Sequence, residues 1–205
     1  MSDTITIAVD AMGGDNSPDK VIQGISIHSK STNNIVYKIF GDKNLIEVLV
    51  SKYKIDHKFE IFHTNEKINN DDSPLSAAKK KNTSMWLAIN SVKEKHSDAV
   101  ISAGNTGALF VIAKLNLEMI TNIDKPALSA LWPNKNGMNI VLDLGANIEC
   151  NEKNFEDFSL MGSALHKALF PDELSKVALL NIGSEEIKGN NTIKNAYKLL
   201  SDKKN

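Results

Sequence analysis

Short apolar runs alternate with amphipathic segments along most of the chain. A continuous apolar run is typical of a strand buried on both faces, whereas apolar positions spaced by three and four residues indicate a helix. Nearly every predicted strand is followed by a predicted helix, and this order is typical of an α/β fold with a largely parallel sheet covered on both faces. The predicted strands are residues 4–10, 35–40, 59–63, 99–102, 127–132, 139–143 and 177–182.

Capping signals place several helix boundaries. Ser17 followed by Pro18 predicts an N-cap and a first helical residue, with the helix running to about residue 29. Asp42 is predicted to cap a helix that runs to about residue 52. Pro74 is predicted to begin a long helix that is interrupted near residues 82–84 and ends near residue 95. The remaining predicted helices cover 106–118, 155–168 and a segment that follows 183–190 and ends near residue 200.

Length and composition predict one domain, residues 1–205, of a soluble protein. The chain can bury one hydrophobic core, and no linker or internal repeat divides it. No apolar segment approaches the ~20 residues of a membrane span, and the first residues lack the pattern of a signal peptide. The single cysteine, Cys150, excludes an internal disulfide framework and fits a reducing compartment. We therefore expect a cytoplasmic protein.

The charged residues restrict the ligands that the chain can bind. The net charge of −1 provides no basic field for nucleic acid, so no nucleic-acid partner is expected. All 24 basic residues are lysines, so an anion must be held by lysine, backbone N–H groups and neutral amides rather than by a guanidinium. The five histidines lack metal-ligand spacing and the glycines lack the spacing of nucleotide-binding loops, so neither a metal nor a cofactor is expected.

Two segments of small and polar residues follow predicted strands and precede predicted helices. They are Ser-Ala-Gly-Asn-Thr-Gly at 102–107 and Asp-Leu-Gly-Ala-Asn at 143–147. Ligands of open α/β sheets bind at such strand ends, where small residues let backbone N–H groups reach an anion and amides add directional hydrogen bonds. The segments therefore predict a site for a small anion, with Gly104, Asn105, Thr106, Gly107, Asp143 and Asn147 as its candidate residues.

Several candidate residues keep two readings. Asp143 either orients Lys188 or caps the following turn, and Asn147 either binds the ligand or holds the turn through an Asx hydrogen bond. Asp10 and Asp15 flank the first glycine-rich turn, where bonding to loop N–H groups is favoured over catalysis. Lys188 lies in the last glycine-rich loop, where its ammonium either pairs with phosphate or is simply solvated.

Two further features have a structural and a functional reading. Cys150 is either an acyl-accepting thiol or, as we favour, a small half-buried residue. The lysines at 79–81 form either a solvated helix turn, which we favour, or part of a docking patch for an acidic carrier protein.

Four long segments in register closely resemble the bacterial acyl-carrier-protein:phosphate acyltransferase family of phospholipid synthesis. They are residues 10–15, 102–109, 143–147 and 180–189, and residues 80–85 and 161–163 extend the resemblance over essentially the whole chain. The resemblance implies a three-layer α/β/α sandwich similar to phosphate acetyltransferase and isopropylmalate dehydrogenase. It also implies a homodimer that makes acyl phosphate from an acyl-[acyl-carrier-protein] thioester and inorganic phosphate.

The resemblance implies further partners. The chain also departs from the family pattern in two ways. Peripheral contact with the inner face of the membrane and with the acyl phosphate-using glycerol-3-phosphate acyltransferase is expected. Family members usually continue beyond residue 205 with elements that form the dimer surface and contact the membrane, so we expect the chain to be truncated at its C-terminus. Ala78 and Lys125 stand where the family usually carries arginine.

Acyl phosphate formation needs no nucleophilic side chain, because phosphate is itself an oxygen nucleophile. It needs charge neutralisation, alignment and donors for the tetrahedral oxyanion. We assign Lys188 and Asn105 as catalytic, with phosphate bound by Gly104, Thr106, Gly107, Asp143, Asn147, Gly13, Gly14 and Asp15. Two alternatives stay open, namely a transferase of this fold that uses an acyl-coenzyme A and a non-catalytic fragment.

Overall fold

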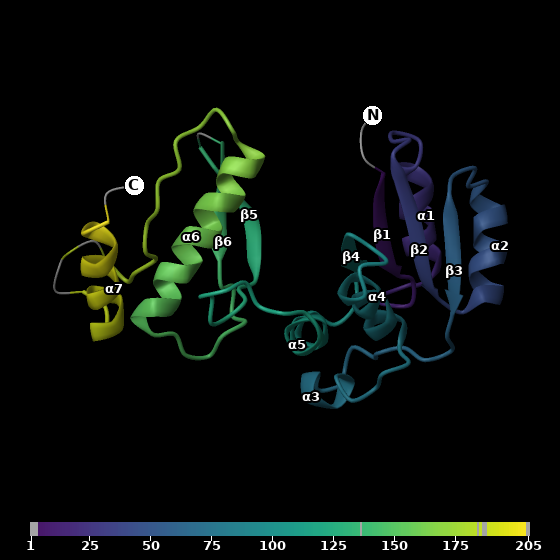
Figure 1. Ribbon diagram of the computed structural model, residues 1–205, viewed down its shortest axis with the longest axis horizontal. Coiled ribbons are helices and arrows are strands. Elements are labelled where there is room, and N and C mark those ends of the chain that lie inside the picture. The colour runs from purple at the N-terminus through teal and green to yellow at the C-terminus, as the bar shows by residue number, and fades with distance from the viewer. Residues whose placement is uncertain (1–3, 136, 184, 186–187, 204–205) are drawn as a thin grey trace. The chain divides into compact units, whose positions relative to one another are not determined.

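A four-stranded parallel sheet organises the first part of the chain (Figure 1). The computed structural model describes residues 4–135, 137–183, 185 and 188–203, which divide between residues 118 and 119 into two units. The strands of the first unit lie in the order β3-β2-β1-β4 and are all parallel, as the alternation predicts. Their bounds are β1 (Ile5–Asp10), β2 (Ile35–Gly41), β3 (Phe59–His63) and β4 (Ala99–Ser102).

Alternate residues of the central strands face two different helical layers. Val9 and Ile39 pack with α1 (Asp19–His28) and α2 (Lys43–Tyr53) in one core cluster. Ala8 and Phe40 pack on the other face against α4 (Ser84–Lys93). Because side chains alternate across a strand, a run that is apolar throughout needs cover on both sides. The first unit therefore has the predicted three-layer α/β/α arrangement.

Side-chain caps begin most helices where the sequence predicts. Asp42 accepts hydrogen bonds from the N–H groups of Asn44 and Leu45, at 2.9 and 3.3 Å. The predicted interruption near residues 82–84 is confirmed, because α3 (Pro74–Ala77) ends early and Thr83 caps α4 separately.

The Ser17 N-cap prediction is wrong. Pro18 occupies the N-cap position of α1, and the helix itself begins at Asp19. The Ser17 hydroxyl instead donates to the carbonyl of Gly13, which ties it to the preceding turn. Ser17 therefore supports the loop rather than the helix.

In the second unit, the strands predicted at 127–132 and 139–143 are observed with shifted ends, but they pair with each other as an antiparallel hairpin rather than joining the parallel sheet. β5 (Ser129–Asn134) pairs with β6 (Gly137–Leu142), and α6 (Glu152–Leu169) packs on β6. A Cβ at Gly162 would lie 2.8 Å from Leu142 Cδ1, so the absence of a side chain there lets α6 approach the strand closely. The last helix, α7 (Asn191–Ser201), packs against α6 through the buried Ala196.

The predicted strand at 177–182 is wrong: within the described residues this segment belongs to no strand. Leu180 and Ile182 are 92% and 85% exposed. The apolar run signals a tendency to be buried, but a strand also needs a hydrogen-bonding neighbour. None of the described residues supplies that neighbour.

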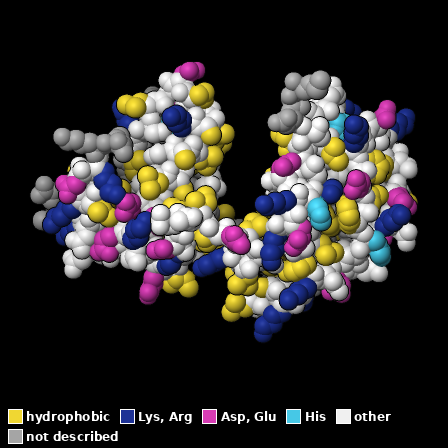
Figure 2. Space-filling view, viewed as in Figure 1, with side chains coloured by type: hydrophobic (Ala, Val, Ile, Leu, Met, Phe, Trp, Pro, Cys, Tyr) yellow, Lys and Arg dark blue, Asp and Glu magenta, His cyan; other side chains and the backbone are white. Residues whose placement is uncertain are grey.

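The apolar helix predicted at 106–118 is observed as α5 (Thr106–Asn116). Ala108 and Ile112 are fully buried and pack with α4, whereas Leu115 is largely exposed. No helix in the part of the chain that the structure describes is long and apolar enough to cross a bilayer. Lysines and acidic side chains are interspersed on the face shown in Figure 2.

Candidate functional site

The carboxyl ends of β1 and β4 are adjacent, because Asp10 and Ser102 are partners in the parallel register. The loops that follow these strands meet backbone to backbone. A Cβ at Gly13 would lie 2.9 Å from Gly104 N, and one at Gly14 would lie 2.5 Å from the carbonyl oxygen of Ala103. Gly14 also has a φ of +86°, which disfavours any side chain. The structure therefore brings together three glycines that the sequence assigned to the site.

Asp10 fixes the base of this double loop. Its side chain is almost fully buried and accepts hydrogen bonds from the hydroxyls of Ser84 and Ser102, at 2.5 and 2.6 Å. A third bond, of 3.2 Å, comes from the N–H of Met12. A buried carboxylate is tolerated when such donors replace its hydration. Asp10 therefore joins β1, β4 and α4 at the strand ends.

Asn105 uses both ends of its amide within the protein. Its Oδ1 accepts from Ala108 N at 2.9 Å and caps α5. Its Nδ2 donates to the carbonyls of Asn70, at 2.9 Å, and Asp72, at 3.4 Å. The first N–H groups of a helix lack intrahelical acceptors, so those of Thr106 and Gly107 remain as donors beside the exposed Thr106 hydroxyl. An anion at this helix end would meet the backbone and Thr106 rather than the Asn105 amide.

A polar cleft of about 270 Å³ lies at the same end of the sheet, between the first glycine-rich turn and the loop after β3. Asp15, one of the predicted residues, lines it and accepts a 3.2 Å hydrogen bond from Asn70 Nδ2. Lys67, which the sequence reasoning missed, lines it as well. The available signal was the polar loop at 65–73, which follows a strand end and contains this lysine.

In the second unit, Asp143 and Asn147 close one turn together. Asp143 Oδ1 accepts from the backbone N–H and from Nδ2 of Asn147, at 3.1 and 2.9 Å, and Asn147 Nδ2 also donates to the carbonyl of Pro126. Asp143 itself has a left-handed φ of +61°. Both side chains therefore hold the turn, which is the structural one of the two readings that the sequence left open.

The surroundings of Cys150 favour the thiol over the thiolate. Its Sγ lies 3.5 Å from Asp143 Oδ2. Burial raises the pKa of the Cys150 thiol, and the Asp143 carboxylate raises this pKa further, against an opposing effect of Lys125. Since the thiolate is the reactive form, this environment does not suit an acyl-accepting nucleophile.

Lys188 lies exposed in the last glycine-rich loop. The loop is held by a bond from Lys188 N to the carbonyl of Glu185, at 2.9 Å, and by one from Asn181 Nδ2 to the carbonyl of Lys188, at 3.3 Å. Within the described residues, no hydrogen bond or ion pair joins its ammonium to Asp143 or Asn147. Three members of the segment 180–189, Ser184, Glu186 and Ile187, lie outside the described residues.

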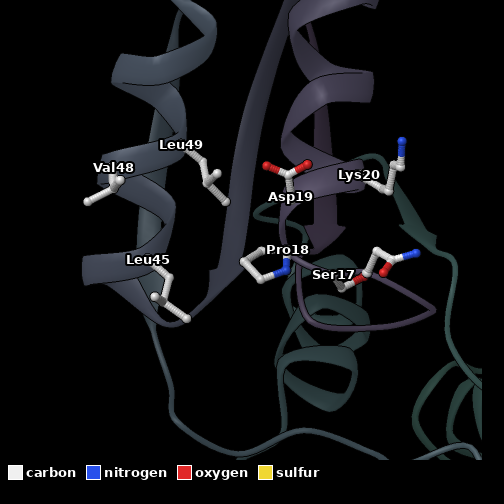
Figure 3. Close-up of a pocket in the computed structure, with 8 residues that line it drawn as sticks. Ser17, Pro18, Asp19, Lys20, Leu45, Val48 and Leu49 are labelled. Carbon is white, nitrogen blue, oxygen red and sulfur yellow. The ribbon is translucent and has the colours of Figure 1, made fainter.

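A larger hollow, of about 630 Å³, lies between the start of α1 and α2 (Figure 3). Leu45, Val48 and Pro18 line it, and it contains none of the predicted site residues. Asp19 at its edge is engaged by Lys52 Nζ, at 2.8 Å, and by the Tyr53 hydroxyl, and these bonds lower the pKa of its carboxyl. No group of three potential metal ligands occurs among the described residues.

Comparisons with known proteins extend over the whole chain. Residues 5–205 match the model of the family described as fatty acid synthesis protein. The chain is 65% identical over 206 residues to a phosphate acyltransferase from Pelagibacter ubique (strain HTCC1062), a match that covers 100% of this chain and 62% of the relative. It is 38% identical over 204 residues to a phosphate acyltransferase from Paramagnetospirillum magneticum (strain ATCC 700264 / AMB-1), with 98% of this chain and 58% of the relative covered.

The chain thus spans about three-fifths of the length of these curated relatives. Among solved structures it is similar to the EutD phosphotransacetylase from Staphylococcus aureus, with a TM-score of 0.61 over 97% of this chain and 64% of that one. The sequence identity there is 14%, so the likeness shows the fold alone, an α/β fold with a parallel sheet.

Proposed function

This chain belongs to the fatty acid synthesis protein family, and we propose that it acts in a phosphate acyltransferase that feeds phospholipid synthesis. The substrates would be an acyl-[acyl-carrier-protein] thioester and inorganic phosphate, and the products an acyl phosphate and the free carrier thiol. The observation that carries the proposal is the double loop after β1 and β4. Backbone N–H groups and Thr106 lie at the N-terminus of α5 beside this double loop. The glycines of the loop, Gly13, Gly14 and Gly104, carry no side chain that would keep an anion from the backbone.

In the proposed reaction, an oxygen of phosphate attacks the carbonyl carbon of the thioester. A C–O bond forms and the C–S bond breaks, and the carrier sulfur leaves as a thiolate that takes up a proton. The protein orients phosphate and offers donors to the oxyanion that develops on the carbonyl oxygen. We assign phosphate binding to Gly104, Thr106 and Gly107, while Asn105 holds their loop in place through its two sets of bonds.

Lys188 is proposed to neutralise the charge of phosphate or of the acyl phosphate product. An ammonium acts as a point charge and needs no bidentate geometry. Gly13, Gly14 and Asp15 are proposed to shape the first loop, and Asp143 and Asn147 to shape the turn that they close. This division keeps every residue of the predicted site but separates direct contacts with phosphate from support of the loops.

The partner proposals rest on family membership. We propose a homodimer that binds acyl-[acyl-carrier-protein] in the cytoplasm and touches the inner face of the membrane, where a glycerol-3-phosphate acyltransferase uses the acyl phosphate. The lysines at 79–81 bear on carrier docking: Lys79 and Lys81 are exposed, whereas Lys80 pairs with Asp72 at 2.7 Å.

The decisive experiment replaces Lys188 in the full-length protein. Lys188→Ala is expected to lower acyl phosphate formation at least about tenfold, the effect of removing one charged hydrogen bond in the transition state. Acyl phosphate is trapped with hydroxylamine and measured against phosphate concentration, and folding is checked by circular dichroism. Lys176→Ala, an exposed lysine of the same unit, is the control. Equal rates for both variants would remove Lys188 from the site, and a preference for acyl-coenzyme A over the carrier thioester would favour the alternative transferase.

A further inference from the structure

The polar cleft beside the first glycine-rich turn contains groups that the phosphate proposal does not use. Its wall is formed by residues 12–17 on one side and 67–70 on the other, all within the first unit. The lining residues with polar side chains are Asp15, Asn16, Ser17, Lys67, Asn69 and Asn70, and Ile68 on its wall is buried. It therefore offers both hydrogen-bond donors and acceptors.

The composition of the cleft argues against the acyl chain and against phosphate as its ligand. An acyl chain needs an apolar lining, which this cleft lacks. Phosphate is a net anion at neutral pH, whereas the cleft balances one ammonium, on Lys67, with one carboxylate, on Asp15. At about 270 Å³ the cleft also falls just below the size of a complete ligand pocket, so it suits one section of a longer ligand.

The position of the cleft links it to the loop proposed for phosphate. Asp15 follows Gly14, whose backbone lies against Ala103 in the loop after β4. On the opposite wall, the carbonyl of Asn70 accepts the 2.9 Å hydrogen bond from the Asn105 amide that caps α5. A ligand in the cleft therefore lies next to the loop whose donors would hold phosphate.

We propose that this cleft binds the neutral, amide-bearing pantetheine arm that carries the acyl thioester. The inference rests on the proposed function for the identity of the ligand and on the cleft for its place. Lys67 Nζ and the Asn69 amide donate to carbonyls of the arm, and the Asp15 carboxylate accepts from its N–H groups. The arm thus lies along residues 67–70 and delivers its sulfur end toward the N-terminus of α5.

The test is a pair of nuclear magnetic resonance titrations of the isotope-labelled full chain, one with neutral pantetheine and one with inorganic phosphate. Pantetheine is expected to shift the backbone amides of residues 14–17 and 67–70. Phosphate is expected to shift those of residues 105–107 and to leave the cleft unchanged. Shifts in the cleft with phosphate but not with pantetheine, or with neither, would overturn the proposal.

Substitutions make the test quantitative. Lys67→Met combined with Asn69→Leu is expected to weaken pantetheine binding about tenfold, the loss of one to two hydrogen bonds. Neither side chain forms a hydrogen bond or ion pair within the described residues, and the Asn69 N–H that bonds Asp72 is retained, so the fold should persist. Lys30→Met, an exposed lysine just beyond α1, is the matched control. Equal affinity of the wild type and the double variant would contradict the proposal.

An activity measurement distinguishes a failure of the proposed function from a failure of the pantetheine site. If the protein forms no acyl phosphate but pantetheine still shifts the cleft, the proposed function fails and the binding site remains. If it forms acyl phosphate and the double variant keeps the wild-type KM for the carrier thioester, the binding site fails and the proposed function remains. A rise in the KM for phosphate instead would assign the cleft to phosphate and overturn the inference.

Discussion

Both units of this chain contain apolar segments, but the first unit buries most of them whereas the second leaves one largely exposed. In the first unit, apolar residues of the central strands β1 and β2 are covered on both faces by helices, and side chains such as Ile22, Ile39 and Ile89 are fully buried. In the second unit, the buried apolar side chains among the described residues are Phe158 and Ala196. Its apolar segment at 177–182, which the sequence predicts as a strand, is largely exposed.

The difference shows that the local sequence sets an apolar pattern, whereas burial depends on neighbours from other parts of the chain. The central strands β1 and β2 find neighbours on both sides because four segments of the chain join the same sheet. The run at 177–182 has an equally apolar sequence but no strand partner among the described residues. Exposed apolar surface of this kind favours association with other chains or with further parts of the same protein.

The largest expected effect contrasts one residue from each unit. Ile39→Ala removes a fully buried side chain from the central strand β2 and should lower the free energy of unfolding by about 2–5 kcal/mol. Leu180→Ala, at a 92% exposed position, should change it by less than about 0.5 kcal/mol. Urea denaturation of both variants measures the contrast. A loss of similar size for Leu180→Ala would mean that this residue is covered in solution.

A smaller effect is expected from the two asparagines. Asn105→Ala removes the N-cap of α5 and should cost about 1 kcal/mol in stability, and Asn147→Ala should cost a similar amount through the turn that it closes with Asp143. Hydrogen exchange reports each unit separately, so each loss should appear in its own unit.

Asn105→Asp sharpens this test, because an aspartate keeps the cap acceptor but loses the amide donor. It should keep α5 capped but leave the carbonyls of Asn70 and Asp72 facing a carboxylate oxygen, so its loss of stability should appear in the loop 70–72 rather than in α5. If the amides contacted phosphate directly, the alanine variants would instead weaken phosphate binding by about 1.5–3 kcal/mol with little change in stability.

The smallest effect concerns pH. The hydrogen bond from Lys80 and that from the N–H of Asn69 lower the pKa of Asp72 in the folded protein. A lowered folded pKa stabilises the protein above the unfolded pKa of about 3.9, and this contribution is lost as the pH falls through the folded value. Asp72→Asn should therefore flatten the acid limb of a stability–pH profile, while the same change at the neighbouring exposed Asp71 should not. Parallel profiles for the wild type and Asp72→Asn would contradict the assignment.

Local signals in the sequence predicted local structure well. The Asp42 cap, the start of α3 at Pro74 and the break before α4 depend on contacts within a few residues, and all three are observed. The Ser17 prediction was wrong because α1 begins one residue later than predicted, with Pro18 at its N-cap, and the Ser17 hydroxyl donates to the Gly13 carbonyl in a turn whose backbone lies against the distant loop at 103–104. Strand 177–182 was wrong because pairing is decided by other parts of the sheet.

The candidate site was predicted in position more than in detail. The order of strands and glycine-rich loops was sufficient to place Gly13, Gly14 and Gly104 at one edge of the sheet. It could not show that the Asn105 amide faces carbonyls of the loop 70–72, because that contact joins residues about thirty-five positions apart. Lys67 was missed for the same reason. Whether the two units form the single domain that the sequence predicts stays a prediction.

The backbone contact between Gly13 and Gly104 has a consequence for recombination. A methyl group at Gly13 would lie 2.9 Å from a backbone nitrogen and 2.5 Å from Oδ2 of the Asp10 carboxylate, which three hydrogen bonds hold in place, so neither loop can make room for the other alone. A chimera whose crossover falls between residues 13 and 104 takes these loops from different parents and must match them by chance. Crossovers outside that span inherit the two loops together, as one transferable module.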